Sequence, residues 1–197
     1  MIKTVADPER QLKSTSVTEH PNQPSVAVII PCWNAEKWVA RAIQSALDQN
    51  YPNLEVIVID DGSTDSSLDV IRSFGDRIRW ETGPNRGACA ARNRGLALTT
   101  AEYVIFLDAD DYIEVGSLAA WAMTAQSADL VLAPFAIERS GVKKHSIQPH
   151  QSADVEAVLR NWLQGVYTPS CSVLWRTAFL NRIGGWNEHA IRNQDGE

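Results

Sequence analysis

Two groups of aspartates follow two separate apolar runs in this 197-residue sequence, and their side chains are well suited to chemistry. The first group is Asp60 and Asp61, and the second is Asp108, Asp110 and Asp111. Carboxylates gathered in one crevice repel each other unless a cation joins them, and hard divalent ions such as Mg²⁺ or Mn²⁺ prefer oxygen ligands. The spacing Asp108-x-Asp110 would let one carboxylate face a metal while the other accepts from a ribose hydroxyl. The pattern therefore predicts a divalent metal site.

A simpler interpretation is that Asp and Gly end these strands because both favour turns. That interpretation suits one Asp-Gly pair, and it is weaker for two groups at equivalent strand ends. The spacing alone leaves a kinase-like or nucleotidyl-transfer site open. Neither a Walker lysine motif nor a GxGxxG loop is present to decide between these alternatives.

The elements around the aspartates alternate between short apolar runs and segments with helical periodicity. The predicted strands cover residues 26–30, 54–59, 78–80, 103–107, 130–136 and 172–175. The predicted helices cover residues 36–47, 66–74, 88–98, 115–126, 155–163 and 177–183. This alternation predicts an α/β fold with a Rossmann-like, mostly parallel sheet flanked by helices. Both aspartate groups would then lie at the carboxyl edge of the sheet, where such folds bind ligands.

Composition narrows the class of protein. Hydrophobic residues make up 44% and charged residues 21%, as in ordinary globular proteins, and the net charge is −6. This charge argues against nucleic acid as a partner, because phosphate-backbone binding normally requires a basic face. The three cysteines show no metal-ligand or disulfide spacing, and residues 1–24 lack the apolar core of a secretory signal. We expect a cytoplasmic protein with a loosely ordered leader over residues 1–24.

Several separate motifs resemble the family 2 glycosyltransferases, which have the GT-A fold. The matching pieces are "VAVIIPCWNAEKWVARAIQSALDQNYPNLEVIVIDDGSTDSS", "NRGACAARNRGL" and "YVIFLDADD", in this order. A shorter match is "GGWNEHAIRNQDGE" at the end of the chain. The resemblance implies a GT-A domain over residues 25–197, with a nucleotide-binding half at 25–112 and a partial acceptor-side half at 113–197.

The resemblance also implies roles for residues around the nucleotide. Those expected to line the nucleotide pocket after the first strand are Pro31, Trp33, Asn34 and Glu36. Asp60 and Asp61 would hold the uracil end of a UDP-type donor. Arg86 and Arg92 would lie near the nucleotide, where a guanidinium can pair with phosphate.

The reaction implied by the family is metal-dependent transfer of a sugar with inversion at the anomeric carbon. Asp108 and Asp110 would form the DxD motif, with Asp108 at the ribose and Asp110 at a Mn²⁺ or Mg²⁺ ion. Asp195 would be the catalytic base that takes a proton from the acceptor hydroxyl. The family usually has Glu where this chain has Gln194, and the chain ends two residues after Asp195. We therefore expect a truncated piece of a longer enzyme.

The partners follow from the same resemblance. We expect a nucleotide-sugar donor, a saccharide or lipid-linked saccharide acceptor, and peripheral association with the inner face of a membrane. Two alternatives stay open: a sugar-nucleotide-binding module without catalysis, and a nucleotidyltransferase. The second would need a basic, glycine-rich loop for a triphosphate near the first strand, and residues 31–34 do not provide one.

Overall fold

Strand β1 (Val26–Cys32) is buried along its whole length at the centre of the main sheet. It pairs in parallel with β2 (Leu54–Asp60) on one side and with β4 (Tyr103–Phe106) on the other. All three are apolar runs rich in β-branched or aromatic residues, which suit strands covered on both faces. The computed structural model describes residues 23–125, 128–139, 142–147 and 169–189.

The main sheet has six strands in the order β3-β2-β1-β4-β8-β5. The outer strands are β3 (Arg79–Thr82), β8 (Val173–Arg176) and β5 (Leu130–Leu132). Strand β8 runs antiparallel to both of its neighbours, and the other pairs of the sheet are parallel. The structure thus confirms an α/β fold with a mostly parallel sheet.

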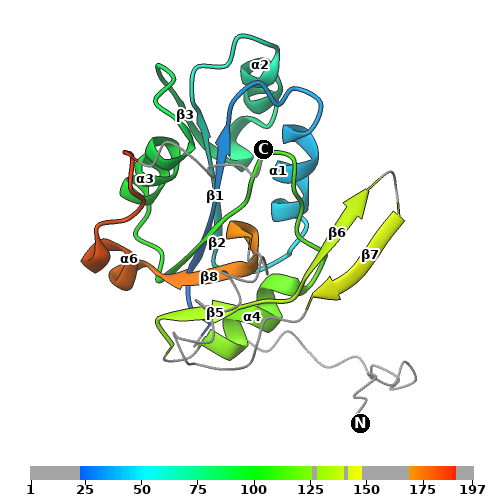
Figure 1. Ribbon diagram of the computed structural model, residues 1–197, viewed down its shortest axis with the longest axis vertical. Helices are drawn as coiled ribbons and strands as arrows, with labels where there is room; N and C mark the ends of the chain where they lie inside the picture. Colours follow the sequence, from blue (N-terminus) through cyan, green and yellow to red (C-terminus); the bar gives the residue numbers. More distant parts are fainter. Residues whose placement is uncertain (1–22, 126–127, 140–141, 148–168, 190–197) are drawn as a thin grey trace.

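Helices cover both faces of this sheet (Figure 1). Helices α1 (Val39–Leu47), α2 (Ser67–Arg72) and α4 (Ser117–Ala125) pack on one face, against a cluster that includes alternate residues of β1. Helices α3 (Ala88–Leu98) and α6 (Thr177–Ile183) pack on the other face, where the remaining residues of β1 point. The alternation of side chains along β1 therefore divides the core into two layers.

Short elements complete the described structure. Two 3-10 turns, η1 (Gly75–Arg77) and η2 (Ser170–Ser172), precede β3 and β8. Strands β6 (Phe135–Arg139) and β7 (Val142–Ile147) form an antiparallel hairpin, which projects beside α1 and α4 in Figure 1. None of the helices in the described ranges combines the length and apolar character needed to cross a membrane.

Two predictions differ from the structure. The single strand expected at 130–136 is two strands, β5 and β6, separated by Ala133 and Pro134. Proline cannot donate a ladder hydrogen bond, which accounts for the break. The helix expected from residue 36 begins at Val39, so Trp38 lies before it, outside the buried stripe, and its side chain is 50% exposed. The helix predicted at 155–163 lies outside the described residues.

Candidate functional site

The aspartates predicted to act together lie at the same edge of the sheet. Asp60 ends β2 opposite Cys32, the last residue of β1. Phe106, which ends β4, pairs with Ile29 of β1, so Asp108 follows β4 at that same carboxyl edge. The edge is the one at which open α/β sheets bind ligands.

Asp60 is 1% exposed, and both of its carboxylate oxygens accept hydrogen bonds. Ser63 donates its backbone N–H to Oδ1 at 3.2 Å, and the Thr82 hydroxyl donates to Oδ2 at 2.6 Å. Asp60 therefore joins the ends of β2 and β3. Its predicted contact with a nucleobase stays a prediction.

Asp61 holds the loop that leads into α3. Its Oδ2 accepts the backbone N–H of Gly87 at 2.7 Å, and its Oδ1 accepts that of Arg86 at 3.0 Å. These two residues directly precede α3, which begins at Ala88, and a negative charge at that end interacts favourably with the helix dipole. Gly62 allows the close approach: its φ is +76°, and a Cβ there would lie 2.8 Å from the Asn85 nitrogen.

Asp108 is fixed by groups on two sides. Nη2 of Arg92 donates to Oδ1 at 2.7 Å, and the hydroxyl of Ser170 donates to Oδ2 at 3.2 Å. The Arg92 side chain is 3% exposed and that of Asp108 is 20% exposed, so this ion pair is largely shielded from water. Charge-assisted hydrogen bonds of this kind are short and directional. Arg92, expected near the nucleotide, therefore contacts the site through Asp108.

Asp110 and Asp111 differ in their surroundings. Asp110 is exposed, whereas Asp111 is partly buried and accepts a hydrogen bond from the Cys171 thiol at 3.2 Å. Burial raises the pKa of Asp111, and the charges of Asp108 and Asp110 raise it further. Burial also raises the pKa of Cys171, as do the carboxylates of Asp111 and Asp108. Ser170 and Cys171, from far along the chain, thus contact Asp108 and Asp111.

The loop after β1 is bound to the loop after β2. Asn34 has φ of +50°, and its Oδ1 accepts the backbone N–H of Thr64 at 2.8 Å. The carboxylate of Glu36 accepts the N–H of Ser66 at 3.0 Å, next to the start of α2. Asp65 accepts the N–H of Ser67, the first residue of this helix, at 2.9 Å. These contacts give Asn34 and Glu36 a structural function; their nucleotide contacts stay predictions.

The other two residues predicted for this pocket differ in exposure. Pro31 is buried within β1, where it pairs in register with Ile59. Trp33 is 58% exposed just beyond the strand. The thiol of Cys32 lies between them in sequence, and burial raises its pKa to about 12, with a contribution from the charge of Asp60.

A segment near the end of the described chain also reaches this edge, which the sequence did not predict. Arg86 pairs with Glu188 at 3.2 Å, although the Arg86 side chain is 69% exposed. Asn93 donates Nδ2 to the other Glu188 oxygen at 2.9 Å and to the carbonyl of Trp186 at 2.8 Å. Asp195, predicted to be the catalytic base, and Gln194 before it lie outside the described residues.

The oxygen donors at this edge suit a hard divalent cation. In the described ranges no group of three or more His, Cys, Asp and Glu side chains has the geometry to hold an ion. Mg²⁺ usually binds through one or two carboxylates together with waters and substrate phosphates. The exposed Asp110, next to the fixed Asp108, fits that mode of binding.

The decisive comparison is with protein families. Residues 27–183 match glycosyl transferase family 2. The chain belongs to this family. A curated relative, an uncharacterized glycosyltransferase of Haemophilus influenzae, is 43% identical over 96 residues, which are 47% of this chain and 38% of that protein. The chondroitin synthase of Pasteurella multocida is 38% identical over 94 residues, 46% of this chain and 10% of the synthase.

Two solved structures have a similar fold. The S. aureus protein TarS, residues 1–349, has a TM-score of 0.65 at 25% identity, over 84% of this chain and 51% of that one. The mannosyltransferase PcManGT of Pyrobaculum calidifontis has a TM-score of 0.62 at 22% identity, over 85% of this chain and 49% of that one. This family 2 chain thus spans about half or less of the length of these proteins.

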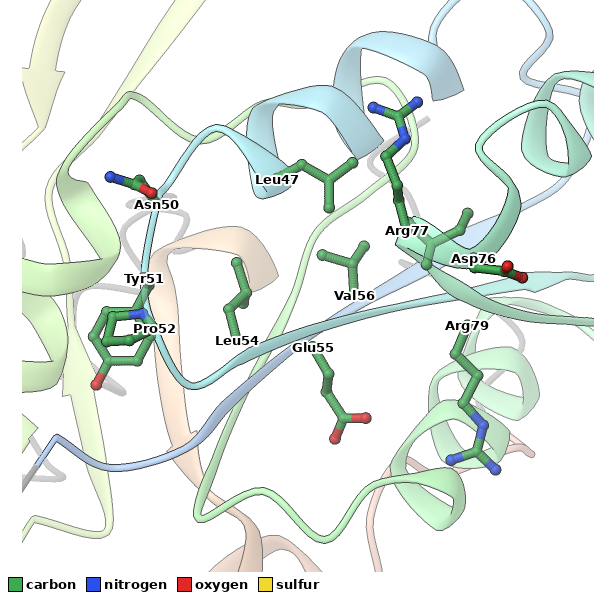
Figure 2. Close-up of a pocket in the computed structure, with 11 residues that line it drawn as sticks. Leu47, Asn50, Tyr51, Pro52, Leu54, Glu55, Val56, Asp76, Arg77 and Arg79 are labelled. Carbon is green, nitrogen blue, oxygen red and sulfur yellow. The ribbon is translucent and has the colours of Figure 1, made fainter.

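One depression on the described family 2 domain lies away from the aspartates. It has a volume of about 560 Å³ and lies at the amino edge of the sheet, beside the starts of β2 and β3. Figure 2 shows Leu47 of α1 and Val56 of β2 pointing toward each other across it, with Arg77 and Arg79 nearby. None of its lining residues is among those predicted to act on a nucleotide.

Proposed function

We propose that this chain carries the donor site of a glycosyltransferase that transfers a sugar from a UDP-sugar, with a divalent metal ion and with inversion. Family 2 membership supports the reaction class. The observation that carries the proposal is the pair formed by Asp108 and Arg92 beside the exposed Asp110. One carboxylate is fixed for a directional contact, and the other is accessible for a cation.

The proposal of a uridine nucleotide draws support from TarS. Structures of TarS in complex with UDP and with UDP-GlcNAc are each 25% identical to this chain, with TM-scores of 0.64 and 0.62. In our proposal Asp60 and Asp61 face the base, and Pro31, Trp33, Asn34 and Glu36 surround it. Arg86 and Arg92 lie near the nucleotide, Arg92 acting through Asp108.

For the metal we propose Asp110 as the protein ligand, with Mn²⁺ or Mg²⁺ as the ion. A divalent ion held there would neutralise the diphosphate as it leaves. With few protein ligands available, the protein alone should bind the ion weakly and bind it tightly only with the nucleotide. Asp195 is the proposed base, and a saccharide or lipid-linked saccharide is the proposed acceptor. A cytoplasmic location and association with the inner membrane face stay predictions.

The first test is calorimetric titration with UDP, in Mn²⁺ and in EDTA. We expect binding that requires the metal and weakens at least about tenfold in Asp110→Ala, because a charged ligand is lost. The control is Asp76→Ala, another exposed aspartate at the opposite edge of the sheet, which should bind like the wild type. Metal-independent binding, or equal losses in both variants, would contradict the assignment. GDP and dTDP in parallel titrations identify the nucleotide.

A second test separates an enzyme from a binding module. A glycosyltransferase site commonly releases the sugar slowly to water, so we expect metal-dependent formation of free UDP from a UDP-sugar. Asp110→Ala should abolish this release. A protein that binds UDP with Mn²⁺ and releases none from any UDP-sugar would be a non-catalytic module.

A further inference from the structure

Asn93 binds the backbone of Trp186 in two directions. Its Oδ1 accepts the Trp186 N–H at 2.8 Å, and its Nδ2 donates to the Trp186 carbonyl at 2.8 Å. A side-chain amide that pairs with both polar groups of one residue fixes the position and the orientation of that residue. The two positions are 93 residues apart, so the contact joins α3 to the segment after α6.

The residue before Trp186 is shaped for this contact. Gly185 has φ of +70°, and a Cβ at this position would lie 2.6 Å from Oδ1 of Asn93. A side chain there would displace the amide from the backbone that it binds. The Gly-Gly turn therefore brings the chain close enough for Asn93 to hold it.

The indole of Trp186 covers Arg92. The Arg92 guanidinium carbon lies 4.7 Å from the centre of the Trp186 ring, and Phe106 meets that ring edge-on at 5.2 Å between centroids. An arginine placed over an aromatic face is attracted to it, more strongly where water is excluded. The Trp186 side chain also has a buried Nε1 with no hydrogen-bond partner in the described structure, so the ring acts through its face.

Arg92 in turn directs its Nη2 to Asp108 at 2.7 Å. We propose that Asn93 and Trp186 are positioning residues of the donor site: Asn93 places the indole, the indole confines Arg92, and Arg92 orients Asp108. The inference rests on the proposed function for its effect on nucleotide binding, and its effect on the Asp108 loop is independent of it. Partners that orient a functional ligand typically change affinity or activity by 10- to 100-fold when removed.

The first readout needs no nucleotide. The Asp111 amide donates to the Asp108 carbonyl at 3.0 Å, so its hydrogen exchange reports on the order of this loop. We expect Asn93→Ala to speed exchange of the Asp111 amide by at least about tenfold, because local opening no longer has to break the contacts of Trp186. The control is Thr177→Val. Thr177 also fixes the β8–α6 unit, through a buried 2.6 Å hydrogen bond to Ala101, but at the opposite edge of the sheet.

The second readout is the affinity for UDP with Mn²⁺, measured by calorimetry on the same proteins. We expect a loss of about tenfold or more in Asn93→Ala and in Trp186→Leu, and no change beyond about twofold in Thr177→Val. Trp186→Phe keeps an aromatic face over Arg92 and gives up no hydrogen bond in the described structure, so it should retain wild-type affinity. If Trp186 only stabilised the fold, Trp186→Phe and Trp186→Leu would not differ in their affinity for UDP in this way.

The outcomes are distinct. Unchanged Asp111 exchange in Asn93→Ala, or equal UDP affinity in Trp186→Leu and Trp186→Phe, overturns the inference. If Asn93→Ala does not fold, Trp186→Leu and Trp186→Phe test the inference, through exchange of the Asp111 amide and through affinity for UDP. If the wild type binds no nucleotide, the proposed function fails, and exchange of the Asp111 amide still decides whether Asn93 and Trp186 order the loop.

Discussion

The Nη2 atom of Arg92 lies 2.7 Å from Oδ1 of Asp108, with the arginine side chain 3% exposed and the aspartate side chain 20% exposed. Removing one partner of a shielded ion pair leaves the other charge poorly solvated, which destabilises more than the loss of a surface pair. The pair is therefore important for stability as well as for orientation.

Arg92→Met tests this relationship. We expect the free energy of unfolding in urea to fall by about 3 kcal/mol, because Asp108 is left without its cation. The control is Arg72→Met, whose pair with Asp69 has side chains that are 52% and 81% exposed. That variant should lose less than about 1 kcal/mol. Restoration of part of the loss by adding Asp108→Asn to Arg92→Met would confirm the cause, and equal losses in the two single variants would contradict it.

The two glycines after α6 provide a matched pair of substitutions. Gly184 and Gly185 have φ of +87° and +70°, so alanine is strained at both, by about 1 kcal/mol. A Cβ at 184 meets nothing within 4 Å, whereas one at 185 meets Asn93. We expect Gly185→Ala to lower the free energy of unfolding by a further 1–3 kcal/mol or so, from overpacking. If Gly184→Ala and Gly185→Ala lower stability equally in thermal unfolding, Asn93 moves aside for the new Cβ without loss of stability, and the prediction is wrong.

The central strands could be predicted from the sequence because they are buried on both faces. The apolar runs that form β1, β2 and β4 can be recognised from the local sequence alone. Parallel pairing of these strands then brings their carboxyl ends to one edge of the sheet. The hairpin β6–β7 could not be predicted in this way. Pro134 splits its first strand from β5 within one apolar run that predicts a single strand, and the strand after Pro134 lies largely exposed.

The site was predictable only in part, for a related reason. The grouping of Asp60, Asp61 and Asp108 follows from strand ends, which are local features. The contacts of Asn93 with Trp186 and of Ser170 with Asp108 depend on how distant segments pack. The contact of Asn93 with Trp186 had one signal in the sequence. It was Gly184-Gly185 before an aromatic residue, which is typical of a turn that brings a side chain back toward the sheet.

Asp61 offers a test of the helix start. Asp61→Ala removes the acceptor for the N–H groups of Arg86 and Gly87, and we expect a loss of about 1–2 kcal/mol in the free energy of unfolding. Asp69→Ala, in the first turn of α2 with an 81% exposed side chain, is the control and should change stability by less than about 0.5 kcal/mol. Chemical unfolding monitored by circular dichroism measures both. A loss in Asp69→Ala as large as in Asp61→Ala would rule out a specific stabilising role for the Asp61 hydrogen bonds.

Cys32 should resist alkylation in the folded protein. Its pKa is raised from 9.0 to about 12 by burial, so at pH 8 only about one thiol in 10⁴ would be ionised. Because the folded pKa is the higher one, the thiol's contribution to stability is present below about pH 9 and is lost as the pH rises toward 12. Iodoacetamide labelling followed by mass spectrometry should find Cys32 unmodified at pH 8 and modified in urea. Rapid labelling without urea would contradict this.

The segment 170–188, which contains the antiparallel strand β8, has an evolutionary consequence. Ser170, before this strand, contacts one oxygen of Asp108, and Trp186, after α6, covers the arginine that holds the other. Both ends of the segment 170–188 therefore hold Asp108, one directly through Ser170 and the other through Trp186 and Arg92. Suppose that recombination exchanges residues 170–188 between relatives. The chimeras should work only when the residues at 92, 93 and 108 of the recipient suit the new residues at 170 and 186. We expect the residues at these positions to have changed together as the family diverged.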